Sequence, residues 1–314
     1  MKLSRRAVLA AAALPMPALA QTRSIRLVVP FAAGGAADSA ARTLAPRMAE
    51  RLGATIVVEN RTGAGGSIGG VEVARAAPDG NTLLWDASSH IVNHALLRGL
   101  SFDYATAFTP ISMATSFPQV IAVKADFPAR DLQGFIAHAR ANPGALNYGI
   151  GNAGGLAGTH LLSQAAGFKA EQISYRGTPQ AMADLLGGRL HFFITDLGPA
   201  VEHLRAGTIR ALAVTTARRV ETLPDVPTVA ESGLPGFDFA SWNGAWMPAR
   251  TPPAIIARLN REIQIIGQGD EAKRHIGALG IVSTTSTPEA LGEFNRRELA
   301  LWARIAAEAN VAKE

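Results

Sequence analysis

The chain has 314 residues, of which 48% are hydrophobic and 18% are charged, and its formal net charge is +5. This is the composition of a folded globular protein, and because no basic run with interleaved aromatic residues occurs, we expect no nucleic-acid partner. Cysteine is absent from the sequence, which excludes disulfide bonds, thiolate catalysis and cysteine-ligated zinc.

The first 20 residues have the pattern of an export signal. Lys2, Arg5 and Arg6 precede an apolar run too short to span a bilayer, and Ala18-Leu19-Ala20 offers small residues for cleavage. The arginine pair also fits a twin-arginine signal, so export by the Tat or the Sec route stays open. We expect a periplasmic protein whose mature chain begins near Gln21. Without the three leader cations it holds 27 Lys and Arg against 25 Asp and Glu, or +2.

The segment 25–52 is predicted to form a strand, a glycine turn and a helix. Ile25 to Phe31 is a short apolar run typical of a buried parallel strand. The turn 32–37 consists of two glycines and four alanines, and Asp38 is predicted to cap the helix that follows. Such a turn offers backbone N–H groups and a helix dipole to a carboxylate or phosphate. A packed turn between strand and helix, the more common case, explains the same residues.

Strands and helices alternate along the rest of the chain. Further strands are predicted at 55–59, 82–85, 119–123, 146–150, 171–175, 190–195 and 209–215, and helices at 68–76, 91–97, 132–141, 156–166 and from 178 to 186. This alternation predicts two doubly wound α/β domains, each with a glycine turn after a strand. Two such domains facing each other across a cleft are the layout of a protein that closes on a small anion.

The tail from residue 242 is predicted to return to the first domain, because it holds only one convincing strand, 242–247. A long helix begins at Ala254, and an amphipathic helix covers 288–309. We therefore divide the chain into an export signal at 1–20, a first lobe formed by 21–123 with 243–314, and a second lobe at 124–242.

Two motifs suggest enzyme chemistry. Gly65-Gly66-Ser67-Ile68-Gly69 matches G-x-S-x-G, but a nucleophile elbow needs a strand running directly into the serine, and residues 60–66 intervene. Gly149 to Gly154 matches G-x-G-x-x-G between a strand and a helix. Arg176 stands where a ribose-binding acid is usual, so an exported NADP-linked oxidoreductase remains the alternative function.

Other titratable residues are ambiguous when taken alone. His90 and His94 are four residues apart but have no third ligand at metal spacing, so no metal site is expected. Arg176 suits paired hydrogen bonds to a carboxylate, and a surface ion pair explains it equally well. Asp196 follows a predicted strand, where it would accept from a ligand or cap the next helix. His160, in the first turns of a predicted helix, is interpreted as a packing residue.

Several blocks of sequence, taken together, point to a known family. They are Arg26 to Gly35 with Asp38, Val57 to Gly69, Ala76 to Leu84, Asn147-Tyr148-Gly149, Tyr175-Arg176-Gly177, Leu223 to Thr228 and Gly233 to Phe237. In this order, and over essentially the whole mature chain, they resemble the substrate-binding receptors of tripartite tricarboxylate transporters, the Bug family.

The resemblance implies a periplasmic-binding-protein fold of type II. Each of its two lobes is a doubly wound mixed sheet, and the ligand is held in the cleft between them. The family captures small carboxylates, such as di- and tricarboxylates, amino acids and aromatic acids, for a membrane permease. The resemblance implies no catalysis and no cofactor, and we expect the protein to be a monomer.

The resemblance also implies two groups of ligand-binding residues. In the first lobe they are Phe31, Ala33, Gly34, Gly35, Ala36, Ala37, Asp38, Ser88 and Ser89. In the second lobe they are Gly151, Asn152, Gly154, Gly155, Leu156, Thr178 and Asp196, to which we add Arg176. In the family, backbone groups of the first loop hold one ligand carboxylate with the help of ordered waters. Asn152 and Gly155 depart from the small residues and serine that the family often has there, which is expected to change the hydrogen bonding of the pocket.

Overall fold

The computed structural model describes residues 23–96, 99–175 and 177–308. The predicted export signal and Arg176 therefore lie outside the described residues. Within the described part, no helix is both long and apolar enough to cross a membrane.

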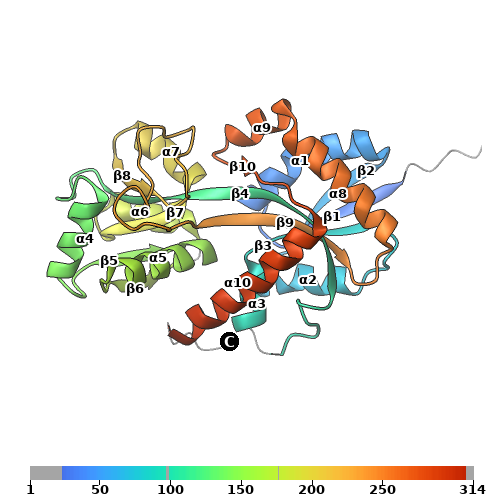
Figure 1. Ribbon diagram of the computed structural model, residues 1–314, viewed down its shortest axis with the longest axis horizontal. Helices are drawn as coiled ribbons and strands as arrows, with labels where there is room; N and C mark the ends of the chain where they lie inside the picture. The colour runs from blue at the N-terminus through green and yellow to red at the C-terminus, as the bar shows by residue number, and fades with distance from the viewer. Residues whose placement is uncertain (1–22, 97–98, 176, 309–314) are drawn as a thin grey trace, which may run out of the picture.

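The structure has two lobes joined by two long strands (Figure 1). Lobe 1 begins with β1 (Ser24–Val29), α1 (Ala36–Leu52), β2 (Thr55–Asn60), the short 3-10 helix η1 (Ala64–Gly66), α2 (Ser67–Ala74), β3 (Thr82–Ala87) and α3 (Ser89–Leu96). Lobe 2 contains α4 (Leu132–Ala141), β5 (Asn147–Ile150), α5 (Ala153–Ala166), β6 (Glu171–Ser174), α6 (Thr178–Leu186), β7 (Phe192–Asp196), α7 (Leu197–Arg205) and β8 (Ile209–Val214). The connecting strands are β4 (Phe108–Lys124) and β9 (Ala240–Pro248). Lobe 1 is completed by α8 (Pro253–Gln268), α9 (Asp270–Gly277), β10 (Val282–Ser283) and α10 (Pro288–Glu308).

The strands follow the order β2-β1-β3-β9-β4-β7-β5-β6, and β8 and β10 also pair with β4. β1 is parallel to β2 and β3, and β5 is parallel to β6 and β7, whereas β4 and β9 are antiparallel to their neighbours. Each lobe is therefore a mixed sheet, and the doubly wound α/β fold with two crossovers is confirmed. The lobe boundaries at 123 and 243 fall within the crossover strands β4 and β9 and stay a prediction.

Apolar residues on both faces of the sheets explain why helices cover them on both sides. In lobe 1, one core cluster joins β1 and β3 to α1, α8 and α9, and another joins the opposite face to α3 and α10. Trp85 and Trp246 are almost fully buried, one in each of these clusters. In lobe 2, α4 and α5 cover one face, and α6 and α7 the other. The tail returns to lobe 1 as predicted, with α10 against α3 and α8 against α1 (Figure 1).

Three predictions about elements need correction. Asp38 does not cap α1, because Gly35 is the N-cap, with extended backbone (φ −72°, ψ 168°), and Asp38 is the third helical residue. The strand expected at 119–123 is only the end of β4. Its first half was missed because Pro110 and Pro118 argue against a central strand; a bulge follows Pro110. The tail also contains α9 and β10, which the sequence did not predict.

Candidate functional site

The registers of the strands bring the carboxyl ends of both parallel sheets to the middle of β4. At the end of β3, Ala87 pairs with Asn243 on β9, which in turn pairs with Thr115 on β4. At the end of β7, Asp196 pairs with Gln119 on β4. Thr115 and Gln119 are four residues apart, or about 13 Å along a strand. The loops that follow the parallel strands of the two lobes therefore face a common region beside the crossover.

The lobe-1 half of this region is the glycine loop between β1 and α1. Residues 32–35 are exposed, and a Cβ built on Gly34, whose φ is +80°, would meet nothing within 4 Å. No side chain caps α1 at Gly35. The N–H groups of Ala36, Ala37 and Asp38 belong to the first turn, so they have no acceptor within the helix. The first turn of α1 thus holds backbone donors and a positive helix end directly behind an exposed loop with little side-chain bulk.

Asp38 holds this loop from the inside. Its carboxylate accepts hydrogen bonds from the Gly34 N–H (2.9 Å), Asn60 Nδ2 (2.8 Å) and Arg42 Nε (2.9 Å), and the residue is 2% exposed. Burial alone would raise the pKa of Asp38, but the bonds from Arg42, Gly34 and Asn60 outweigh it and hold the pKa below its ordinary value. The Gly34 N–H is therefore committed to Asp38, and the donors left for a ligand lie further along, at the start of the helix.

The loops after β2 and β3 close in around the same point. A Cβ on Gly66 would lie 3.1 Å from the Pro30 Cβ and 3.5 Å from the Ser89 Oγ, so the three loops are in contact. The Ser89 hydroxyl donates to the buried Asp86, while Ser88 is half-buried and its carbonyl accepts the first bonds of α3.

The predicted ligand-binding residues do not include the loop 63–66, although this loop is rich in glycine, like the loop between β1 and α1. All four of its residues have positive φ, including Ala64 at 45°. Because non-glycine residues rarely adopt such angles, the conformation of Ala64 is strained and must be held by its surroundings. One support is visible, since the Asn93 side chain donates to the Gly65 carbonyl (2.9 Å).

The lobe-2 half is the loop between β5 and α5. Asn152 caps α5, because its Oδ1 accepts from the Gly155 N–H (2.8 Å), and its Nδ2 donates to Asp196 Oδ2 (3.0 Å). The N–H groups of Ala153 and Gly154 remain without an intrahelical acceptor. A Cβ on Gly151 would lie 2.7 Å from the Thr178 Cα, so the start of α6 is packed against this loop.

Asp196 is nearly buried and faces the protein interior. Burial raises the pKa of Asp196, and hydrogen bonds from Gln119, Ser241 and Asn152 oppose that rise. Leu156, half-buried on α5, packs against the cluster that contains Trp242. Gln119 and Ser241 were not predicted as site residues, and nothing in their local sequence distinguishes them.

The two enzyme-like motifs lie in surroundings that do not match the enzyme sites they resemble in sequence. Ser67 begins α2 after the η1 turn rather than directly after β2, which ends at Asn60. In the G-x-G-x-x-G loop, Cβ atoms on Gly151 and Gly154 would run into Thr178 and Ser241, so these glycines make room for the protein itself rather than for a pyrophosphate. His90 stacks on Trp246 with ring centroids 4.1 Å apart, and His94 pairs with Asp103. Among the described residues, no group of three or more candidate ligands gathers around a metal site.

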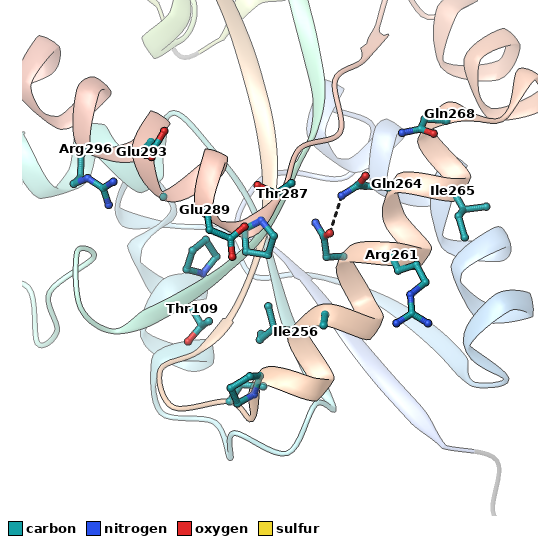
Figure 2. Close-up of a pocket in the computed structure, with 17 residues that line it drawn as sticks. Thr109, Ile256, Arg261, Gln264, Ile265, Gln268, Thr287, Glu289, Glu293 and Arg296 are labelled. Carbon is teal, nitrogen blue, oxygen red and sulfur yellow. Dashed lines mark hydrogen bonds between the residues drawn. The ribbon is translucent and has the colours of Figure 1, made fainter.

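A separate groove of about 1030 Å³ lies between α8 and α10, away from these loops (Figure 2). One of its buried polar residues, Asn260, donates to the carbonyls of Ile111 and Ser286 (2.7 Å each) and accepts from Gln264 (2.7 Å). These partners hold α8 to β4 and to the segment before α10, so the polar groups of Asn260 serve the fold of lobe 1.

Two mixed α/β lobes, two crossover strands and helix N-termini directed at the region between them define a solute-binding protein of the periplasmic type. Residues 40–305 match the model of the tripartite tricarboxylate transporter family receptor. The chain belongs to this family, which is one of substrate-binding receptors.

Individual relatives are similar to this chain over nearly its full length. Protein BugT of Bordetella pertussis is 34% identical over 309 residues, which cover 96% of this chain and 94% of BugT. The structure of Rhodopseudomonas palustris Rpa4515 with adipate is 33% identical, covers 93% of this chain and 99% of that one, and has a TM-score of 0.82. MatC (Rpa3494) from the same organism, with bound malate, is 30% identical over 91% of this chain and 99% of its own, with a TM-score of 0.76.

Proposed function

We propose that this protein is an exported receptor that captures a small linear dicarboxylate for the permease of a tripartite tricarboxylate transporter. The observation that carries this proposal is the start of α1, where three backbone N–H groups have no acceptor within the helix and lie behind an exposed loop that has no bulky side chain. Because these donors are part of the backbone, they favour an anionic oxygen whatever the rest of the ligand is. The predicted export signal supports the periplasm as its location.

A dicarboxylate is favoured because both lobes offer the same kind of donor. The first turn of α5 leaves the N–H groups of Ala153 and Gly154 without an acceptor in the helix, as the first turn of α1 does for its own donors. Relatives of about 30% identity were solved with adipate and with malate, each of which carries two carboxylates. One carboxylate on each helix start would span the region between the lobes, and the approach of the lobes would exclude water from both.

The expected affinity follows from the number of donors. A hydrogen bond to a charged group contributes about 1.5–3 kcal/mol, so three to five of them, less the cost of ordering the ligand and the lobes, reach micromolar binding, about −8 kcal/mol. No chemical step is needed. The loaded, closed state is what a permease would recognise, and we expect the receptor itself to act as a monomer.

A thermal-shift screen of the chain from residue 21 tests this proposal. The panel contains mono-, di- and tricarboxylates, amino acids, aromatic acids and NADPH. At a ligand concentration of about 1,000 times Kd, binding adds about 4 kcal/mol to the free energy of unfolding, which is readily seen as a rise in Tm. We expect the largest rise with a dicarboxylate of four to six carbons. A rise with NADPH alone would favour the oxidoreductase instead.

A further inference from the structure

Gln119 occupies the point where β4 passes from one lobe to the other. Its neighbour Pro118 pairs with Ala240 on the crossover strand β9, whereas Gln119 itself pairs with Asp196 on β7. The side chain is completely buried, and the Gln119 carbonyl accepts from the Thr215 N–H (2.9 Å). The residue is therefore fixed at the junction between the crossover strands and lobe 2.

The amide of Gln119 is the centre of a chain of hydrogen bonds that crosses four elements. Its Nε2 donates to the Ser241 Oγ on β9 (3.1 Å) and to Asp196 Oδ1 at the end of β7 (3.2 Å). The other oxygen of Asp196 accepts from Asn152 (3.0 Å), and Asn152 caps the first turn of α5 by accepting from the Gly155 N–H (2.8 Å). One continuous set of bonds thus connects both crossover strands to the start of α5.

The backbone of α5 also lies directly against this amide. A Cβ on Gly154 would lie 2.7 Å from Gln119 Nε2, and one on Gly158, a turn later, would lie 2.7 Å from Gln119 Oε1. Two glycines on one face of α5 therefore allow the helix to approach the glutamine more closely than other residues would permit. A shift of the first turn of α5 toward β4 would therefore press against the Gln119 amide.

The arrangement has a cost that an apolar residue would avoid. Gln119 Oε1 has no hydrogen-bond partner among the described residues, although it is buried. A buried acceptor without a partner costs about 1–3 kcal/mol. A glutamine at this position is therefore explained by what its nitrogen donates rather than by filling space.

We propose that Gln119 is a positioning residue: by holding Asp196 from β4, it fixes the first turn of α5, and with it the lobe-2 half of the ligand site, relative to the strands that join the lobes. The statement that α5 contacts the ligand rests on the proposed function. The position of α5 itself can be tested without a ligand.

The test removes the hydrogen-bond donor of Gln119 and then exchanges the donor and acceptor between Gln119 and Asp196. Gln119→Glu sets a second carboxylate against Asp196, and Gln119→Leu removes the donors without adding charge. Adding Asp196→Asn to Gln119→Glu restores one donor and one acceptor at nearly unchanged shape. Adding Asp196→Asn to Gln119→Leu restores nothing. Thr195→Val is the matched control, because Thr195 is buried beside Asp196 and its hydroxyl has no hydrogen-bond partner in the described part of the chain.

Amide hydrogen exchange at residues 153–158, measured by mass spectrometry on the ligand-free protein, is the first readout. We expect both Gln119 variants to exchange about tenfold faster there, as the loss of a hydrogen bond worth about 1.4 kcal/mol would produce. The added Asp196→Asn should slow exchange again in the Gln119→Glu protein only, and Thr195→Val should match the wild type. Unchanged exchange in both Gln119 variants, equal rescue in both backgrounds, or an effect of Thr195→Val as large as theirs would overturn the proposal.

Calorimetric titration with adipate or malate is the second readout. We expect the affinity to fall in the same variants whose exchange is faster and to recover in the double variant. If the wild-type protein binds neither acid, the proposed ligand class fails while the exchange result still decides the role of Gln119. If exchange follows the pattern but affinity is equal in all variants, Gln119 fixes the first turn of α5 but α5 is not part of the ligand site, and the proposal that Gln119 positions half of that site is overturned.

Discussion

Replacing Ala36 by proline would remove one backbone donor from the glycine loop with little disturbance of the fold. Ala36 is the first residue of α1, where proline is well tolerated because its missing N–H has no partner in the helix. The residue before a proline must be extended, and Gly35 already has φ −72° and ψ 168°. The Ala36→Pro protein should therefore be as stable as the wild type, or more stable by up to about 1 kcal/mol.

The expected loss is in ligand binding. A backbone hydrogen bond to a carboxylate is worth about 1.5–3 kcal/mol, so its removal should weaken binding roughly 10- to 150-fold. Titration calorimetry with the tightest carboxylate from the screen measures this, and thermal unfolding verifies the fold. Ala36→Ser, which changes the side chain but keeps the N–H, is the control and should bind as the wild type does. A proline variant with wild-type affinity would show that the start of α1 does not hold the ligand.

Three further predictions concern the same loop and its support. Asp38→Asn should lower the free energy of unfolding at pH 7 by about 1–3 kcal/mol, measured by urea denaturation. Since the pKa of Asp38 is lowered in the folded state, its contribution is present at neutral pH and is lost as pH falls through that pKa, so the difference between the variant and the wild type should shrink in acid. Gly34→Ala should cost about 1–2 kcal/mol because φ is +80°, although its Cβ would meet nothing within 4 Å; a cost near zero would show that the angle is not what matters. Gly35→Ala, at φ −72°, avoids that strain, and its cost comes from a Cβ that would lie 3.2 Å from the Ala32 carbonyl oxygen. Gly35→Val should leave the fold intact and reduce carboxylate binding, and unchanged affinity would mean that the ligand does not approach this residue.

Much of the fold could be predicted because it depends on local patterns. The apolar run of β1, the glycine turn and the start of α1 lie next to one another in the sequence, and each has its own signal. The exact cap was predicted incorrectly, since Asp38 is a good capping residue by type. Its actual partners, Arg42 and Asn60, include a residue from the following strand. A local pattern could not show that the carboxylate turns inward.

The lobe-2 half of the site shows what local sequence patterns could not predict. Asp196 was predicted from its place after a strand and Asn152 only from the family resemblance, but the bonds that orient them come from Gln119 and Ser241. These two residues are 122 positions apart and meet because β4 and β9 pair side by side, with Phe117 opposite Ser241. In the sequence, Gln119 looks like a polar residue at the start of a short strand. Its burial follows from the length of β4, which its prolines concealed.

In the proposed binding mode, the backbone donors recognise the negative charge of a carboxylate and no other feature of the ligand. The most direct measurement compares, by titration calorimetry, the best dicarboxylate with the diamide of the same carbon skeleton. We expect micromolar or tighter binding of the acid and, because several hydrogen bonds would lose their charge, at least about 100-fold weaker binding of the diamide. Equal affinity for both compounds, or no heat with any carboxylate, would contradict it.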